Sequence, residues 1–151
     1  AGGVADGKSL AARVSLGAVG ASIGSRFYAS TESMADNTLK NKMVESRGDD
    51  TQRKQVFDII REIPWPPEYT GRALKNVFTT KWHDNETELK RQLHQHQAKF
   101  FSEQQSNNLD SAIIWAGECI DSIHAIQSAE TIINEMVTHA KHSLENPTYI
   151  R

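Results

Sequence analysis

Apolar residues recur at helical spacing near both ends of the chain. Near the N-terminus, Asp6 suits a helix N-cap, and the spacing of the apolar residues behind it predicts a helix over residues 7–16. Near the C-terminus, Ser128 suits the same capping role for a longer amphipathic helix that Asn146 and Pro147 stop. The apolar side of that longer helix comprises Ile132, Ile133, Met136, Val137, Ala140 and Leu144. Both segments are therefore predicted to be helices with one buried side.

Two further helices are predicted in the middle of the chain. Ser30 or Thr31 can cap the first, which covers residues 32–46. Asn85, with Glu88 three residues later, forms the sequence pattern of a capping box and opens the second. The second helix runs to about residue 104, and its apolar side comprises Leu89, Leu93, His96 and Phe100.

The segment over residues 56–60, Val-Phe-Asp-Ile-Ile, is ambiguous by pattern alone. Its apolar residues fit a helical period that continues to Ile63, while the run of apolar and β-branched residues also fits a strand. Three prolines over residues 64–67 then exclude regular structure. In this stiff loop we expect Trp65 and Tyr69 to pack against the rest of the fold, with the lining of a substrate channel as the alternative.

Glycine-rich turns lie on either side of the first predicted helix. Residues 1–7 are Ala-Gly-Gly-Val-Ala-Asp-Gly, and residues 20–27 are Gly-Ala-Ser-Ile-Gly-Ser-Arg-Phe. Between the helix and the second turn, small residues over 19–23 predict a short buried strand. Two such turns can direct backbone N–H groups at a single phosphate, although glycines also serve as helix caps and tight turns. The order of turn, helix, strand and turn fits the last βα units of a (β/α)8 barrel, where phosphate sites are common.

These residues carry a resemblance to a known family. The two turns, with Gly-Ala-Val-Gly-Ala over residues 17–21, resemble the FMN-phosphate segments of the nitronate monooxygenases, formerly called 2-nitropropane dioxygenases. Residues 65–76, Trp-Pro-Pro-Glu-Tyr-Thr-Gly-Arg-Ala-Leu-Lys-Asn, resemble the family's W-P-x-x-Y-x-G-R segment ending in Asn. Ala116 and Gly117, followed by the final helix, resemble its C-terminal end. The resemblance spans nearly the whole chain.

The resemblance implies an α/β fold, namely the C-terminal portion of an FMN-binding (β/α)8 TIM barrel with a helical extension after the last strand. Such a barrel typically needs about 250 residues, whereas this chain has 151 and begins without Met, so we expect it to be part of a longer protein. We expect residues 1–30 to form the last βα units with the phosphate-binding turns, and residues 31–151 to form the helix-rich extension of the same domain. The resemblance also favours a strand over residues 56–60.

The resemblance further implies that Gly2, Gly3, Gly24 and Ser25 bind the FMN phosphate. The glycines would allow close approach of the backbone, and Ser25 would donate a hydroxyl hydrogen bond. A side chain at Gly24 would then block that approach and strain the backbone. Arg26 could reach the same anion or form a salt bridge on the outside of the barrel.

The chain departs from the family pattern at Cys119 and Asp121, where family members usually have glycines. Side chains there could narrow the site or add negative charge near an anionic substrate. We expect Cys119 to have a small apolar packing role rather than a reactive thiol. In the family, a histidine near the flavin lies upstream of the Ala-Gly-Gly turn, and none of the six histidines here matches it. We therefore assign no catalytic residue, and because His94 and His96 point to different helix faces we predict no metal site.

As to function, the resemblance implies an FMN-dependent oxidoreductase that oxidises alkyl nitronates or nitroalkanes with dioxygen to a carbonyl compound and nitrite. One alternative is a non-catalytic truncated remnant that acts as an interaction module. Another is a different flavin-dependent TIM-barrel reductase, such as an enoyl reductase. The segment over residues 65–76 favours the monooxygenase.

Composition and charge limit the kinds of binding partner and the cellular compartment that we expect for this protein. The formal net charge is −2 with both signs interspersed, so no basic stripe for nucleic acid and no polybasic membrane patch is predicted. A single cysteine excludes an internal disulfide framework, and no apolar run approaches the ~20 residues of a transmembrane helix. We expect a cytoplasmic protein, with an upstream targeting sequence left open, and the sequence indicates no oligomeric state.

Overall fold

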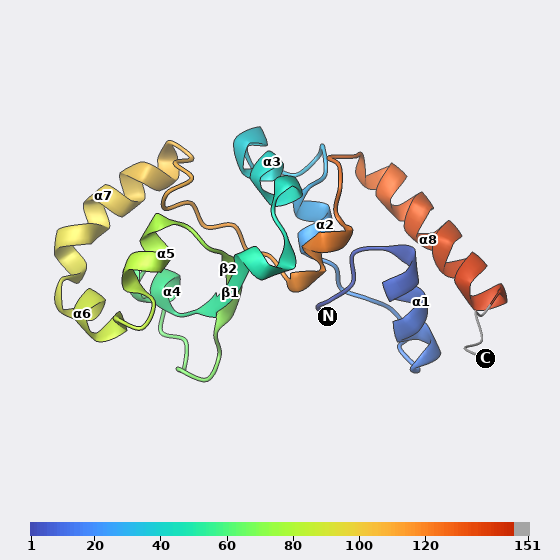
Figure 1. The fold of residues 1–151 in the computed structure, drawn as a ribbon, viewed down its shortest axis with the longest axis horizontal. Helices are drawn as coiled ribbons and strands as arrows, with labels where there is room; N and C mark the ends of the chain where they lie inside the picture. Colours follow the sequence, from blue (N-terminus) through green and yellow to red (C-terminus); the bar gives the residue numbers. More distant parts are fainter. Residues whose placement is uncertain (147–151) are drawn as a thin grey trace. The chain divides into compact units, whose positions relative to one another are not determined.

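The computed structural model describes residues 1–146, which are mixed α/β and divide into two compact units (Figure 1). Unit 1 comprises Ala1–Gly48 and the chain from Gly117 onward, and unit 2 comprises Asp49–Ala116. The 3₁₀-helix η1 (Gly48–Asp50) lies where the chain passes from one unit to the other. Over the described residues, no helix has the length and apolar character needed to cross a membrane.

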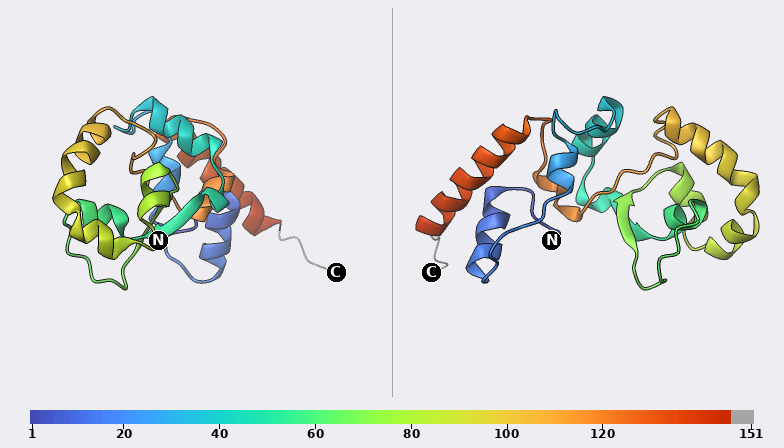
Figure 2. Two further views of the ribbon diagram at one scale, coloured as in Figure 1. Left: turned by 60° about the vertical axis from the view of Figure 1, so that its left-hand side comes forward. Right: turned by 180° about the vertical axis from the view of Figure 1, so that it is seen from behind.

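Unit 1 is built around a pair of helices from opposite ends of the chain. Its elements are α1 (Gly7–Ser15), α2 (Ser25–Tyr28), α3 (Asn37–Glu45), the 3₁₀-helix η2 (Glu118–Ser122) and α8 (Ala129–Glu145). Helices α1 and α8 lie side by side in each view (Figures 1 and 2). A small core forms where Val4 meets Ile132 and Met136 of α8. The partly buried side chains of Leu10, Ile23 and Phe27 complete it.

The predicted helices at the two ends of the chain are confirmed. Asp6 caps α1 in a capping box with Ser9, whose backbone N–H donates to the Asp6 carboxylate at 2.7 Å. Ser128 caps α8 and accepts the N–H of Thr131 at 3.1 Å. Pro147, predicted to stop α8, lies outside the described residues. Only part of the predicted apolar side of α8 is buried: Ile132, Met136 and Ala140 face the core, whereas Ile133, Val137 and Leu144 are exposed.

Two predictions for unit 1 are wrong. Residues 19–23 form no strand, because no neighbouring strand among the described residues pairs with them, and Val19 is fully exposed. The next helix begins at Asn37 rather than near residue 32, since its cap is Asp36, whose carboxylate accepts the N–H of Thr38 at 2.8 Å. Ser30 and Thr31 instead lie along Gln127, whose carbonyl accepts the Thr31 N–H at 2.9 Å.

Unit 2 combines a two-stranded antiparallel sheet with four helices (Figure 1). The strands β1 (Thr51–Lys54) and β2 (Gly71–Leu74) pair with Thr51 opposite Leu74 and Lys54 opposite Gly71. The helices are α4 (Val56–Ile60), α5 (Val77–Trp82), α6 (Glu86–Arg91) and α7 (Leu93–Gln105). Residues 112–116 run along the free edge of β2, where Leu74 N–H donates to the Ile114 carbonyl at 3.0 Å. The core of the unit comprises Val56, Phe57, Ile60, Ala73, Trp82, Leu89 and Phe100.

The expected strand over residues 56–60 is wrong, because this segment forms the helix α4. A helical turn brings Val56, Phe57 and Ile60 onto one side, where all three are fully buried, whereas a strand would alternate them between two faces. The loop that follows is irregular, as its prolines predict.

The helix predicted over residues 85–104 is divided at Gln92 into α6 and α7. Asn85 precedes α6 but makes no capping bond with its side chain, so the predicted capping box is absent. A capping box does occur at the start of α5, where the Asn76 side chain accepts the Thr79 N–H at 2.9 Å.

Helix α1 depends on a glycine where it crosses α8. A Cβ atom on Gly7 would lie 2.5 Å from His139 Cβ and 2.7 Å from the Met136 carbonyl oxygen. We predict that Gly7→Ala lowers the free energy of unfolding by about 1–3 kcal/mol, because overpacking forces the helices apart. Gly20→Ala is the control, since a Cβ there meets nothing within 4 Å. Equal urea midpoints for the two variants, followed by circular dichroism, would contradict close packing of α1 on α8.

Unit 2 contains a buried ammonium group. Lys54 is 2% exposed, and among the described residues its Nζ has no hydrogen-bond partner. Burial, with a contribution from Lys75, lowers the pKa of Lys54 to about 8.

The unfolded chain therefore binds the Lys54 proton more tightly than the folded chain does. The free energy of unfolding should rise as the pH increases from about 8 toward 10.5. We predict that Lys54→Met removes this rise and stabilises the protein at pH 7 by about 1–3 kcal/mol. A stability curve with the same pH dependence in both proteins would contradict this assignment.

Candidate functional site

The two glycine-rich turns of unit 1 meet beside η2. The Ser25 side chain and the Gly3 backbone both lie close enough to the Cys119 thiol to lower its pKa, against the larger effect of burial, which raises it. The backbone N–H of Gly117 donates to Ser25 Oγ at 3.0 Å. The structure thus brings together Gly3 from the first turn, Ser25 from the second, and two residues that follow unit 2 in the chain.

The backbone at both turns is open. Gly2 and Gly3 have φ angles of 85° and 71°, a left-handed conformation that strongly favours glycine. A Cβ atom on Gly2 or Gly24 would meet nothing within 4 Å, so each turn presents an uncovered stretch of main chain. At Gly24 the expected backbone strain is wrong, because its φ of −99° suits any residue.

Arg26 has neither of the roles predicted for it. Its buried guanidinium donates to the backbone carbonyls of Ala29 and Ala125, the latter at 3.1 Å, and to the side-chain oxygen of Gln127. Burial lowers the pKa of Arg26, against the opposing effect of Glu135. The side chain therefore ties α2 to the segment that precedes α8.

The side chains at the two usual glycine positions both contact unit 1 itself. The Asp121 carboxylate accepts the backbone N–H of Gly48 at 2.9 Å. Cys119 is half-buried. Burial raises the pKa of Cys119, which agrees with the prediction that it is not a reactive thiol.

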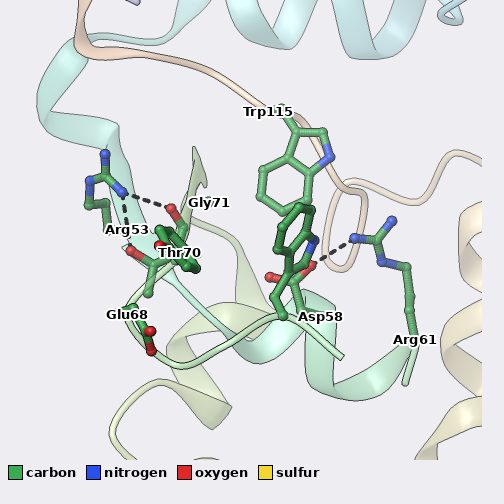
Figure 3. A pocket seen from close by; sticks show the side chains of 9 residues that line it. Arg53, Asp58, Arg61, Glu68, Thr70, Gly71 and Trp115 are labelled. Atoms are coloured by element: carbon green, nitrogen blue, oxygen red, sulfur yellow. Dashed lines mark hydrogen bonds and ion pairs between the residues drawn. The ribbon is translucent and has the colours of Figure 1, made fainter. Parts of the chain in front are cut away.

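A second concave surface lies in unit 2, where the proline-rich loop faces Trp115 (Figure 3). It is a pocket of about 730 Å³ lined by Arg53, Asp58, Arg61, Trp65, Glu68, Tyr69, Thr70, Gly71 and Trp115. Trp65 and Tyr69 are each 62% exposed, so the expectation that they pack against the fold is wrong and they line a pocket instead. The sequence left open that these two aromatic residues line a channel, but it did not place Arg53 and Trp115 beside them, because both reach the pocket only through pairing along the sheet.

Paired glycine-rich turns in an α/β fold are an arrangement by which many proteins hold a phosphate-bearing cofactor. Residues 1–139 match the family model described as nitronate monooxygenase, and the chain belongs to the nitronate monooxygenase family. This is a family of flavin-dependent oxidoreductases.

Individual relatives agree with this assignment. The chain is 32% identical over 106 residues to nitronate monooxygenase npaC of Metarhizium robertsii, a match that covers 66% of this chain and 29% of the relative. It is 26% identical over 148 residues to a nitronate monooxygenase of Neurospora crassa, covering 96% of this chain and 38% of the relative. The solved structure of FabK from Thermotoga maritima superposes with a TM-score of 0.77 at 26% identity, covering 95% of this chain and 44% of that one.

These matches confirm the predicted fold class, an α/β chain that forms part of a barrel enzyme. The chain spans less than half the length of each of these three relatives.

The raised pKa of Cys119 has a measurable consequence. Since the thiolate is the reactive form, alkylation of the folded protein by iodoacetamide should be slow at pH 7 and should still be increasing above pH 9. In the same protein unfolded in urea, the rate should level off nearer the ordinary thiol pKa. Mass spectrometry of the peptide that contains Cys119 follows the reaction. Faster alkylation of the folded than of the unfolded protein at pH 7 would contradict the assignment.

Proposed function

We propose that the protein to which this chain belongs is an FMN-dependent oxidoreductase that oxidises alkyl nitronates or nitroalkanes with dioxygen, giving a carbonyl compound and nitrite. We propose further that this chain supplies the FMN-phosphate site, formed by Gly2, Gly3, Gly24 and Ser25. Family membership supports the reaction. The observation that carries the site is the position of Ser25, whose Oγ accepts the Gly117 N–H at 3.0 Å beside η2, while the Gly3 backbone and the Ser25 side chain both lower the pKa of the same thiol, Cys119.

The residues present fit a phosphate group. The backbone of the left-handed turn is open at Gly2, and a Cβ atom on Gly3 would meet only the Arg13 guanidinium, at 3.5 Å, so an anion can approach this turn closely. Ser25 Oγ already accepts the N–H of Gly117, so its own hydroxyl proton is available to donate to a phosphate oxygen. Bound FMN would supply the redox chemistry, and this chain's own contribution is to hold and orient it.

Cys119 is compatible with this role although it replaces a glycine. The pKa of its thiol is affected by the Gly3 backbone and the Ser25 side chain, the same groups that would bind the phosphate. Because burial raises the pKa of Cys119, the thiol stays protonated at neutral pH and adds no negative charge beside a phosphate dianion. The thiol therefore takes up space at the site without repelling the anion.

The site is tested by titrating deflavinated protein, expressed from the complete reading frame, with FMN. Gly24→Asp should be the harsher change, because its carboxylate would face the phosphate dianion. Folding should be preserved, since the φ of Gly24 is ordinary and its Cβ position is open. Ser25→Ala should weaken FMN binding roughly ten- to hundredfold, as loss of one hydrogen bond to a charged group costs about 1.5–3 kcal/mol.

His94→Ala is the control, because His94 is an exposed residue of unit 2 and should leave FMN affinity unchanged. Equal affinity in wild type, Gly24→Asp and Ser25→Ala would show that the phosphate binds elsewhere.

The absorbance spectrum of the purified protein tests the proposal that the whole protein is a flavin enzyme. A flavin spectrum near one equivalent is expected, and its absence after reconstitution with FMN would favour a remnant that does not bind flavin.

A further inference from the structure

We propose that the aromatic pocket of unit 2 is a second binding site, and that it takes a planar aromatic carboxylate. Its lining residues all belong to Asp49–Ala116 and include none of the residues proposed to bind FMN, so the proposal does not rest on the function proposed for them. A volume of about 730 Å³ falls within the range of small-molecule pockets, which is roughly 300–1,000 Å³.

One wall of the pocket is the indole of Trp115, which is held in place from several sides. A Cβ on Gly71 would lie 2.3 Å from the Trp115 ring, so the absence of a side chain at this position lets the indole lie against β2. Phe57 packs edge-on against the ring at a centroid distance of 5.8 Å, and the Arg61 guanidinium lies 5.7 Å from its centroid. The ring remains 37% exposed, which leaves indole surface available to a ligand.

The proline-rich loop supplies two further aromatic side chains on a stiff backbone. Trp65 and Tyr69 both line the pocket, and each is mostly exposed. Prolines restrict this backbone, and the Tyr69 N–H donates to the Pro66 carbonyl at 2.9 Å. The Gln55 side chain also donates to the Pro67 carbonyl. Ordering such a loop around a ligand costs little conformational entropy, so stacking on its aromatic rings can contribute directly to affinity.

The charges of the pocket favour an anionic group on that ligand. Asp58 and Arg61 form an ion pair of 3.0 Å and neutralise one another (Figure 3). Arg53 has no carboxylate partner among the described residues, and its Nη1 donates to the Thr70 carbonyl and hydroxyl at 2.7 and 3.2 Å. These two bonds fix the guanidinium and leave its other N–H groups for a carboxylate.

Glu68, the other acidic residue of the pocket, should repel a bound anion only weakly. It is exposed on the loop, and within residues 1–146 no hydrogen bond or ion pair holds its side chain toward the pocket. It can therefore turn into solvent when an anion binds, whereas Arg53 is fixed on a strand.

The test uses 2-naphthoate as a fluorescent probe, with the neutral 2-naphthamide as its isostere, on the protein expressed from the complete reading frame and saturated with FMN. We expect saturable binding of naphthoate, with naphthamide about tenfold weaker. Arg53→Gln should weaken naphthoate about tenfold and leave naphthamide unchanged. Trp65→Ala should weaken both probes, since both stack on the ring. Arg91→Gln is the matched control, because Arg91 is another exposed arginine of unit 2 and lies outside the pocket.

Several outcomes would overturn the proposal. Equal naphthoate affinity in wild type, Arg53→Gln and Trp65→Ala would place the probe elsewhere, and no saturable binding at millimolar naphthoate would remove the site. Tighter binding of 2-naphthylmethylammonium than of naphthoate would show that the pocket prefers a cation. Naphthoate binding that appears only when FMN is removed would assign the probe to the flavin site. None of these results bears on the FMN titrations of the Gly24 and Ser25 variants, so the two proposals fail separately.

Discussion

Unit 1 depends on hydrogen bonds made by two adjacent side chains of the short helix α2. Ser25 accepts the N–H of Gly117, 92 residues away, and Arg26 donates to the carbonyl of Ala125, 99 residues away. A helix of four residues has almost no stability of its own, so these long-range bonds hold it in place. They also fix the second glycine turn relative to the first. Without them, Ser25 would lose the position beside Gly117 on which the proposed phosphate site depends.

Unit 2 meets a different constraint, because two strands alone make a marginal sheet. Residues 112–116 lie along β2 and hydrogen-bond to it through Ile114 and Ala116, while the helices cover the hydrophobic side. This pairing also carries Trp115 to the surface above Gly71. The same contacts that stabilise the sheet therefore form the wall of the aromatic pocket, and a side chain at Gly71 would disturb both.

Local features of the sequence predicted part of this structure well. Asp6 and Ser128 cap helices as expected, because an N-cap depends on neighbours within a single turn. Features that depend on distant partners were predicted poorly. The segment over residues 56–60 has the composition of a strand. It forms a helix because its contacts with α6 and α7 bury one side of the segment. Residues 19–23 needed a neighbouring strand that the described residues do not provide. The glycine turns were recognisable from spacing, whereas the contact of Cys119 with both turns depends on a long-range return of the chain.

The chain leaves unit 1 at Gly48 and returns to it at Gly117, and these two positions are neighbours in space. The Gly48 N–H donates to Asp121, and a Cβ on Gly48 would lie 2.8 Å from the Glu118 carbonyl oxygen. A segment whose two ends adjoin can be gained, lengthened or exchanged in a single genetic event without rethreading the domain that carries it. Unit 2 has this relation to unit 1. The turns near the N-terminus can thus stay under one set of selective pressures while the aromatic pocket of unit 2 diverges under another.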